Sequence, residues 1–303
     1  MNAANSALAQ PGQVELPSLN RRAFDARAIR NTLLSGLAWL MAIVASIPLF
    51  SVLYMLIVRG GSRLDWEALT TLPPAGFEMG GGFGNAIVGT FAMVGIAAAI
   101  SVPVGILCAV FLAELGSESR LASIVRFAAK TLTGFPSILA GVFAYAAVVL
   151  LTGGYSAPAG GVALAVLMVP TVILTAEESM RMVPKIMKDA AYGIGCTRTQ
   201  VILKIVLPTA IPGVLTGVML AVARAAGETA PLLFTALFSS YWLFHDGDLA
   251  IMQPTASLAV LIFNFSGMPF DNQIELAWAA SLVLVMIVLV INLASRMITH
   301  RKI

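Results

Sequence analysis

The sequence predicts an all-α polytopic membrane protein, and three observations indicate this class: its hydropathy, its low charge content and the length of its apolar runs. Of the 303 residues, 59% are hydrophobic and only 11% are charged, and the mean hydropathy is +0.92. A soluble domain of this size carries far more charge on its surface. The net charge is only +3, so no nucleic-acid partner is expected.

Six apolar runs are long enough to cross a bilayer, because a helical span needs about 20 residues. We expect these spans at about 32–58, 84–113, 131–152, 159–176, 209–237 and 272–296. A secretory signal peptide has a shorter apolar core, of about 7–15 residues, than the first of these runs. We therefore expect residues 1–30, which are polar and rich in arginine, to form a flexible cytoplasmic arm, and residues 31–303 to form one transmembrane domain.

Lysine and arginine gather on one side of the predicted membrane. Of the 18 such residues, four lie in the N-terminal arm, three in the second loop, five in the fourth loop and three in the C-terminal tail. Only Arg59 and Arg63 lie opposite, and Arg224 falls inside a span. Cytoplasmic loops carry an excess of basic residues. This distribution predicts that both termini and the even-numbered loops are cytoplasmic.

The fifth loop, residues 239–271, contains the apolar stretch "TASLAVLIFNF", residues 255–265. This stretch is too short to cross the bilayer, so we expect it to lie at the interface or to dip partway. The alternative is a seventh span. That alternative would place the basic C-terminal tail outside the cell, against the positive-inside rule.

The fourth loop, residues 177–208, is long for a connection between neighbouring spans. Its apolar residues recur at three- and four-residue steps, which predicts an amphipathic helix: Met180, Met182, Val183, Ile186, Met187, Ala190 and Ala191. We expect Gly193 and Gly195 to end this helix, a second short helix to cover residues 199–206, and Pro208 and Pro212 to break the chain before the fifth span. The pattern favours docking on a partner and binding to anionic lipid through Lys185 and Lys188 about equally.

The fifth span carries two charges, Arg224 and Glu228, within "AVARAAGETAPLLFTALF", residues 221–238. An arginine at the centre of a span costs about 2.5–3.5 kcal/mol. Four residues apart, the two side chains share a helix face. Either they neutralise each other and hold the helix in the bundle, or Arg224 binds an anion while Glu228 holds the guanidinium in place. The planar guanidinium suits the oxygens of phosphate, and the residues alone leave both interpretations open.

Enzymatic and metal sites are not indicated. "GGGFGNAIVGT", residues 80–90, is glycine-rich but lacks the lysine of a phosphate-binding loop, and we expect its glycines to form a flexible entry to the second span. His245 and His300 lack metal-ligand spacing. Pro103, Pro136 and Pro170 are expected to kink their helices, with the alternative that residues 135–137 line a path.

Two resemblances refine these expectations. The stretch "DAAYGIGCTRTQVILKIVLP", residues 189–208, resembles the EAA loop of ABC-importer permeases, with either Gly193 or Gly195 in the glycine position. In that family the loop forms a coupling helix that inserts into a cleft on an ATPase subunit. The resemblance implies an ATPase-coupling role for Lys185, Lys188, Asp189, Ala190, Ala191, Gly193 and Gly195.

The stretch "ARAAGETAPLLFTA", residues 223–236, resembles the PstA-type family of phosphate permeases. Four further stretches agree: "GNAIVGT", "TGFPSILAG", "MQPTASLAVLIF" and "LAWAASLVLV". The family often has an arginine before the Thr-x-Glu that ends the fourth span, whereas this sequence has Leu174 there. The resemblance implies the type I ABC-importer permease architecture and a substrate path formed by Arg224, Glu228 and Thr229.

This resemblance also implies the surroundings of the chain. They are the bacterial inner membrane, a PstC-like permease as heterodimer partner, two PstB-like ATPase subunits that bind ATP and magnesium, and a PstS-like phosphate-binding protein. The chain itself is expected to bind no cofactor and no metal. Permeation of another oxyanion or solute is the alternative, and an ion-coupled secondary transporter is a weaker one, because inverted repeats are not apparent in the sequence.

Overall fold

The computed structural model describes residues 26–245 and 248–300, which fall into two units divided between Tyr54 and Met55. The first unit consists of almost all of α1 (Ala26–Met55), and the stretch Arg30–Gly60 is long and apolar enough to cross a membrane. Of the predicted arm, residues 26–30 therefore belong to a helix. The remainder of the arm, residues 1–25, lies outside the described residues.

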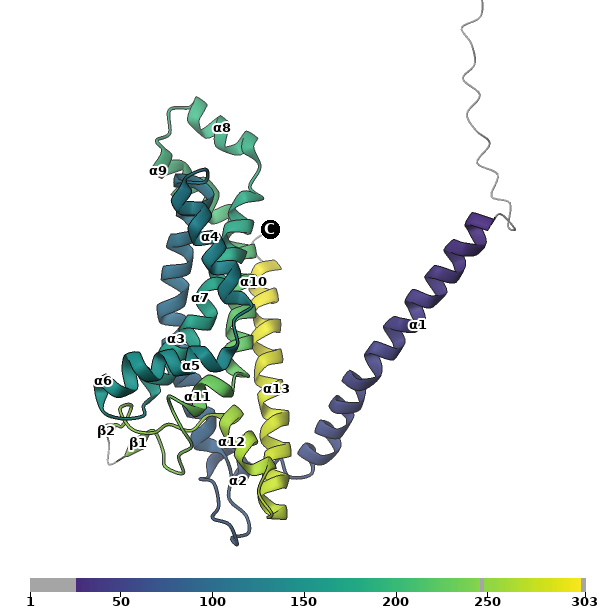
Figure 1. Ribbon diagram of the computed structural model, residues 1–303, viewed down its shortest axis with the longest axis vertical. Helices are drawn as coiled ribbons and strands as arrows, with labels where there is room; N and C mark the ends of the chain where they lie inside the picture. Colours follow the sequence, from purple (N-terminus) through teal and green to yellow (C-terminus); the bar gives the residue numbers. More distant parts are fainter. Residues whose placement is uncertain (1–25, 246–247, 301–303) are drawn as a thin grey trace, which may run out of the picture. The chain divides into compact units, whose positions relative to one another are not determined.

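The second unit is built from helices and π-helical turns, with one short strand pair (Figure 1). In chain order the elements are η1 (Leu56–Gly60), α2 (Trp66–Thr70), α3 (Gly84–Val110), η2 (Phe111–Leu115), α4 (Arg120–Thr133), α5 (Ser137–Ala144), η3 (Tyr145–Val149), α6 (Leu150–Thr152), α7 (Ala157–Arg181), α8 (Lys185–Gly193), α9 (Arg198–Val201), η4 (Ile202–Val206), α10 (Leu207–Ala226), α11 (Ala230–Leu233), β1 (Phe244–His245), β2 (Asp248–Leu249), α12 (Leu258–Ser266) and α13 (Asp271–His300).

Membrane-length helices confirm the predicted fold class. Within the described residues, five helices can cross a membrane by length and composition, at 30–60, 84–115, 157–181, 198–226 and 271–294. The predicted span 131–152 is interrupted where Pro136 was expected to kink it, and α4 and the helix from Ser137 to Thr152 form a pair bent by 107°. The bend falls at Gly134–Pro136, where the proline lacks the N–H that would continue the helix. The count reaches six only if this bent pair forms one span.

The predicted fifth span, 209–237, is wrong at both ends. The helix begins at Arg198, and Pro208 and Pro212 do not break it. In the π-helical turn η4, the N–H of Leu207 donates to the carbonyl of Ile202. Proline is tolerated where its missing N–H and its ring fit into such a local adjustment. At the other end the helix stops at Ala226, where Gly227 and then Pro231 oppose its continuation.

The helix within the stretch 255–265 is shorter than the about 20 residues that a span needs. This helix, α12, has nine residues. The start of α12 is fixed to α3, because the N–H of Leu258 donates to Thr90 Oγ1 over 2.9 Å. Next to this bond, Gly89 approaches the backbone of Ala256 so closely that a Cβ on Gly89 would lie 2.0 Å from the Ala256 oxygen. The stretches "GNAIVGT" and "MQPTASLAVLIF" therefore contact each other.

The glycine-rich stretch before α3 has a packing role. Gly81 has a φ of +72°, a backbone conformation that favours glycine. A Cβ on Gly82 would lie 2.3 Å from the carbonyl oxygen of Ala68. These contacts explain the glycines by close approach of the backbone to α2, and not by the flexible entry that the sequence predicted.

The core lies where α3, α7 and α10 pack together, with α13 alongside (Figure 1). Small residues allow these helices to approach closely, as is common between membrane helices. On α10, Gly213 faces Ser179 of α7 and Gly217 faces Thr175 of α7. A Cβ on Gly217 would lie 2.1 Å from Thr175 Oγ1. The core therefore depends on the absence of a side chain at these positions.

Candidate substrate path and coupling loop

The charged pair lies where α10 ends and not within a continuous helix. Arg224 occupies the last turn of α10, and Glu228 lies in the turn beyond the helix end. The N–H of Gly227 donates to the carbonyl of Arg224, and the N–H of Glu228 donates to the carbonyl of Ala225. This turn keeps the two side chains together, with Arg224 Nε donating to Glu228 Oε1 over 3.4 Å. The prediction that the two residues pair is confirmed. The prediction that they lie on one face of a continuous span is wrong, because Arg224 lies at the end of a helix and Glu228 lies in the turn that follows.

The guanidinium of Arg224 is only partly engaged. Its side chain is 43% exposed, while that of Glu228 is 17% exposed. Among the described residues, Glu228 is its sole hydrogen-bond partner, and this bond uses Nε. The two Nη atoms are thus open to a ligand. Parallel N–H groups of this kind bind phosphate or carboxylate oxygens in a bidentate manner.

Arg224 lies on the exposed face of α10. Thr216, Leu220 and Arg224 follow each other at four-residue steps, and all three are exposed. The opposite face, with Val214, Val218, Ala221 and Ala225, is buried in the core with α7. An arginine facing lipid near the bilayer centre costs about 2.5–3.5 kcal/mol. The exposed face therefore suits contact with water or another polypeptide.

Thr229 immediately follows the charged pair and stands at the N-cap of the short helix α11. It is half-buried, and its carbonyl accepts hydrogen bonds from the N–H groups of Leu232 and Leu233. The structure thus brings the three predicted path residues, Arg224, Glu228 and Thr229, into one break between α10 and α11. The helix α10, which leads to this break, packs against α13 (Figure 1).

The predicted amphipathic helix of the fourth loop is shorter than its apolar pattern indicated. The helix α7 continues through Met180 to Arg181, and α8 begins only at Lys185. Pro184 separates them, because a proline disfavours helical conformation in the residue before it. After α8, Gly195 has a φ of +88°, so Gly195 makes the left-handed turn and Gly193 is the last helical residue. Of the two glycines expected to end this helix, Gly195 thus has the left-handed conformation.

The second helix of the loop begins with a capping box. The Thr197 hydroxyl accepts from the N–H of Gln200, whose side chain accepts in return from the N–H of Thr197. This arrangement satisfies N–H groups that a helix start otherwise leaves unpaired. As a result α9 begins at Arg198 and continues through η4 into α10, so the loop leads into the helix that carries Arg224.

The loop of α8 and α9 projects at one end of the second unit (Figure 1). Its apolar side chains are largely exposed: Met182 at 69%, Ile186 at 76% and Ile194 at 83%. Ala191 is buried against the core, while Lys185, Asp189, Ala190, Gly193 and Gly195 are exposed. Of the predicted coupling residues, Lys188 differs, because its ammonium group pairs with Glu114 of the same chain. Exposed apolar residues on a projecting loop are typical of a surface that docks on a partner.

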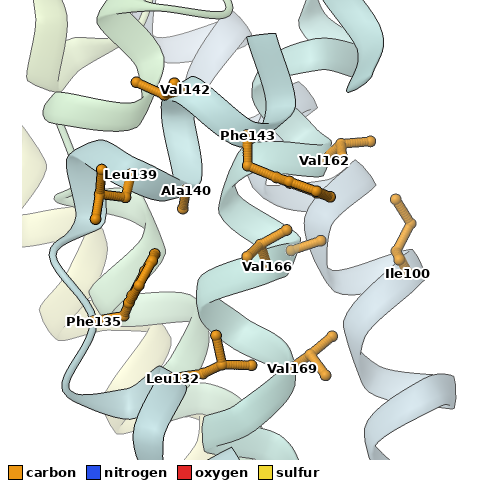
Figure 2. A pocket seen from close by; sticks show the side chains of 11 residues that line it. Ile100, Leu132, Phe135, Leu139, Ala140, Val142, Phe143, Val162, Val166 and Val169 are labelled. Carbon is orange, nitrogen blue, oxygen red and sulfur yellow. The ribbon is translucent and has the colours of Figure 1, made fainter. Parts of the chain in front are cut away.

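A large apolar cavity of about 740 Å³ lies elsewhere, between α3, α4, α5 and α7 (Figure 2). Its lining includes Phe135, Phe143, Val166 and Ile100 but no charged side chain. The lining offers a phosphate dianion no polar side chain that could replace its hydration. The structure therefore places Phe135, the alternative path residue, in a cavity that does not suit an anion.

Comparison with known proteins finds a matching family model and closely similar relatives. The family model described as binding-protein-dependent transport system inner membrane component matches residues 101–303. The chain is 38% identical to the phosphate transport system permease protein PstA of Haemophilus influenzae, over 91% of this chain and 96% of that protein. It is also 38% identical to the PstA of Yersinia pestis, over 89% of this chain and 87% of that protein.

Solved structures show the same fold. A bacterial alginate ABC transporter, in complex with an alginate pentasaccharide-bound periplasmic protein, aligns over 92% of this chain and 98% of that chain, with a TM-score of 0.64 and 14% sequence identity. The MetNI methionine ABC transporter, in an inward-facing conformation, aligns over 72% of this chain and 93% of that chain, with a TM-score of 0.58 and 18% identity. The helical arrangement is thus that of ABC-importer permeases. With 38% identity to two PstA permeases over about nine tenths of its length, the protein belongs to the PstA family of inner-membrane transport permeases.

Proposed function

We propose that this chain is the membrane-spanning permease subunit of an ATP-driven importer of inorganic phosphate, where it forms half of the translocation path. The observation that carries the proposal is the Arg224 guanidinium, exposed at the broken end of α10 and held on one side only by Glu228. The relatives that match most of the chain are phosphate transport permeases. An arginine balanced by one acid attracts the dianion and binds it weakly enough for release, as conduction requires.

The other half of the path comes from a PstC-like permease, which covers the exposed face of α10. Two PstB-like subunits hydrolyse ATP with magnesium on the cytoplasmic side, and a PstS-like protein delivers phosphate from the opposite side. Both termini and the loop of α8 and α9 face the cytoplasm, consistent with the basic residues of the sequence. ATP binding closes the ATPase pair, the loop transmits this movement to the spans, and phosphate passes Arg224.

The proposal is tested by transport in a defined system. The tagged chain is co-expressed with its permease and ATPase partners, purified as a complex and reconstituted in liposomes with the binding protein. We expect uptake of radiolabelled phosphate that requires both ATP and the binding protein and that excess sulfate does not reduce. Uptake of sulfate in place of phosphate would indicate a permease for another oxyanion, and uptake without ATP would contradict an ABC importer.

The exposed isoleucine of α8 provides a prediction about docking. We expect Ile186→Asp to reduce the ATPase subunit that co-purifies with the chain by at least about fivefold, because a carboxylate in an apolar contact loses its hydration. The measurement is the ratio of the two subunits after affinity purification. Leu121→Asp, at an exposed leucine of α4 outside the loop, is the matched control and should leave the ratio unchanged. An unchanged ratio for Ile186→Asp would place the ATPase contact elsewhere.

A further inference from the structure

Both helices of the coupling loop, α8 and α9, contact the C-terminal end of α3. The Lys188 ammonium group of α8 pairs with the carboxylate of Glu114, in η2 at the end of α3. From α9, Arg198 Nη2 donates to the carbonyl of Glu114 and to that of Leu115, the latter over 3.1 Å. The residue Glu114 is therefore contacted through its side chain by one helix of the loop and through its backbone by the other.

These contacts have a clear physical basis. The last carbonyls of a helix lack intrahelical partners and carry the negative end of the helix dipole. Cationic side chains such as that of Arg198 satisfy them. The side chains of Lys188 and Glu114 are only 18% and 11% exposed, so the pair is screened less by solvent than an ordinary surface ion pair.

A second set of contacts joins the same helix end to α4 and α7. Arg126 of α4 donates to the carbonyls of Leu112 and Ser117, over 2.8 and 3.0 Å. Its Nε donates to Glu177 Oε1 of α7 over 2.6 Å, and Arg181 contacts the same oxygen over 2.9 Å. The Glu177 side chain is only 7% exposed, so this carboxylate depends on both arginines. The end of α3 is thus fixed to the bundle as well as to the loop.

We propose that Glu114 is a positioning residue that joins the coupling loop to α3, so that movement of α8 is transmitted to α3 as well as to α10. The proposal rests on the proposed function, since it assumes that α8 receives the movement of an ATPase. Lys188 then acts inside the chain and not as a contact to the ATPase. The far end of α3 holds the start of α12 through Gly89 and Thr90, so the transmitted movement reaches the opposite end of the bundle.

The test is the coupling of transport to ATP hydrolysis in the reconstituted complex. For Glu114→Gln and for Lys188→Gln we expect normal assembly and ATPase activity within about twofold of the original, while the phosphate transported per ATP falls at least about fivefold. The charge swap Glu114→Lys with Lys188→Glu should restore at least half of the original ratio. Lys130→Gln, an exposed lysine of α4 without an ion-pair partner among the described residues, is the matched control and should leave the ratio unchanged.

A second measurement does not depend on phosphate. Spin labels at Glu118→Cys and Tyr192→Cys, with Cys108 and Cys196 replaced by serine, report the separation of the loop from the end of α3. We expect one narrow distance distribution with and without ATP, and a broad one after Glu114→Gln. Two results would overturn the proposal. One is an unchanged amount of phosphate transported per ATP in assembled Glu114→Gln. The other is a charge-swapped variant whose loss of phosphate transported per ATP is as large as the losses of the two single variants combined. If the original complex shows the narrow distance distribution but does not transport phosphate, the proposed function is wrong, whereas the inferred connection between the loop and α3 is supported.

Discussion

Replacement of Arg224 by glutamine is expected to lower ATP-dependent phosphate uptake by about tenfold to a hundredfold. A hydrogen bond to a charged group is worth about 1.5–3 kcal/mol, and each 1.4 kcal/mol is a factor of ten. The amide of glutamine retains polarity but removes the charge and the two Nη donors that are free of partners among the described residues. Arg224→Lys keeps the charge without the planar fork, so we expect an intermediate rate. The measurement is the initial rate of uptake in liposomes that contain equal amounts of assembled complex.

The control for this series is Arg120→Gln, at an exposed arginine of α4 without an ion-pair partner among the described residues. It makes the same chemical change outside the proposed path and should leave uptake unchanged. Glu228→Gln removes the carboxylate that partly neutralises the positive charge of Arg224. We therefore expect tighter phosphate binding, with a lower KM and a lower maximal rate of uptake. Uptake at the original rate by assembled Arg224→Gln would contradict the ligand role. Loss of assembly in Arg224→Gln would indicate that the pair serves packing.

The second large effect is expected at Gly217, where α10 lies against α7. A Cβ on Gly217 would lie 2.1 Å from Thr175 Oγ1 and 2.5 Å from Thr175 Cβ. Rotation of the threonine cannot remove both contacts, since its Cβ is fixed to the backbone of α7. Gly217→Ala must therefore separate the two helices, and overpacking of this kind costs about 1–3 kcal/mol. We expect a lower Tm of the purified chain in detergent and a reduced yield of assembled complex.

Gly95→Ala is the matched control for this prediction. Gly95 lies in another membrane-length helix, α3, and a Cβ at this position meets nothing within 4 Å. The same added methyl group should therefore leave the Tm unchanged. If Gly217→Ala and Gly95→Ala behave alike, the close packing of α10 on α7 does not contribute to stability.

The membrane class and most of the long helices could be predicted from the sequence, because apolar runs of about 20 residues are typical of transmembrane helices. The structure contains α3, α7 and α13 close to the expected positions. Two of the wrong element boundaries have a common reason. Apolar composition continues through Gly134–Pro136 and through the end of α10 at Ala226. Hydropathy reports burial in lipid and does not register the local effect of Pro136 and Gly227, next to which these two helices stop.

The charged pair could be found from its four-residue spacing, since side chains that far apart remain close even across the end of a helix. The contacts of Glu114 could not be found in this way. Its partners Lys188 and Arg198 lie 74 and 84 residues away along the chain, and a single sequence carries no signal for pairing over such separations. The arginine contact to backbone carbonyls is still less visible, because an acceptor of that kind is present at every position.

The unbroken path of α9, η4 and α10 has a mechanical consequence. From Arg198 at the loop to Arg224 at the charged pair the chain is one helix, so at 1.5 Å per residue the two arginines are separated by roughly 39 Å along a stiff rod. If such a rod pivots by about 10° near its loop end, its far end sweeps through roughly 7 Å, more than the width of a phosphate ion. A slight tilt at the loop end would thus produce a larger displacement at Arg224, the end of the helix that carries the proposed phosphate ligand.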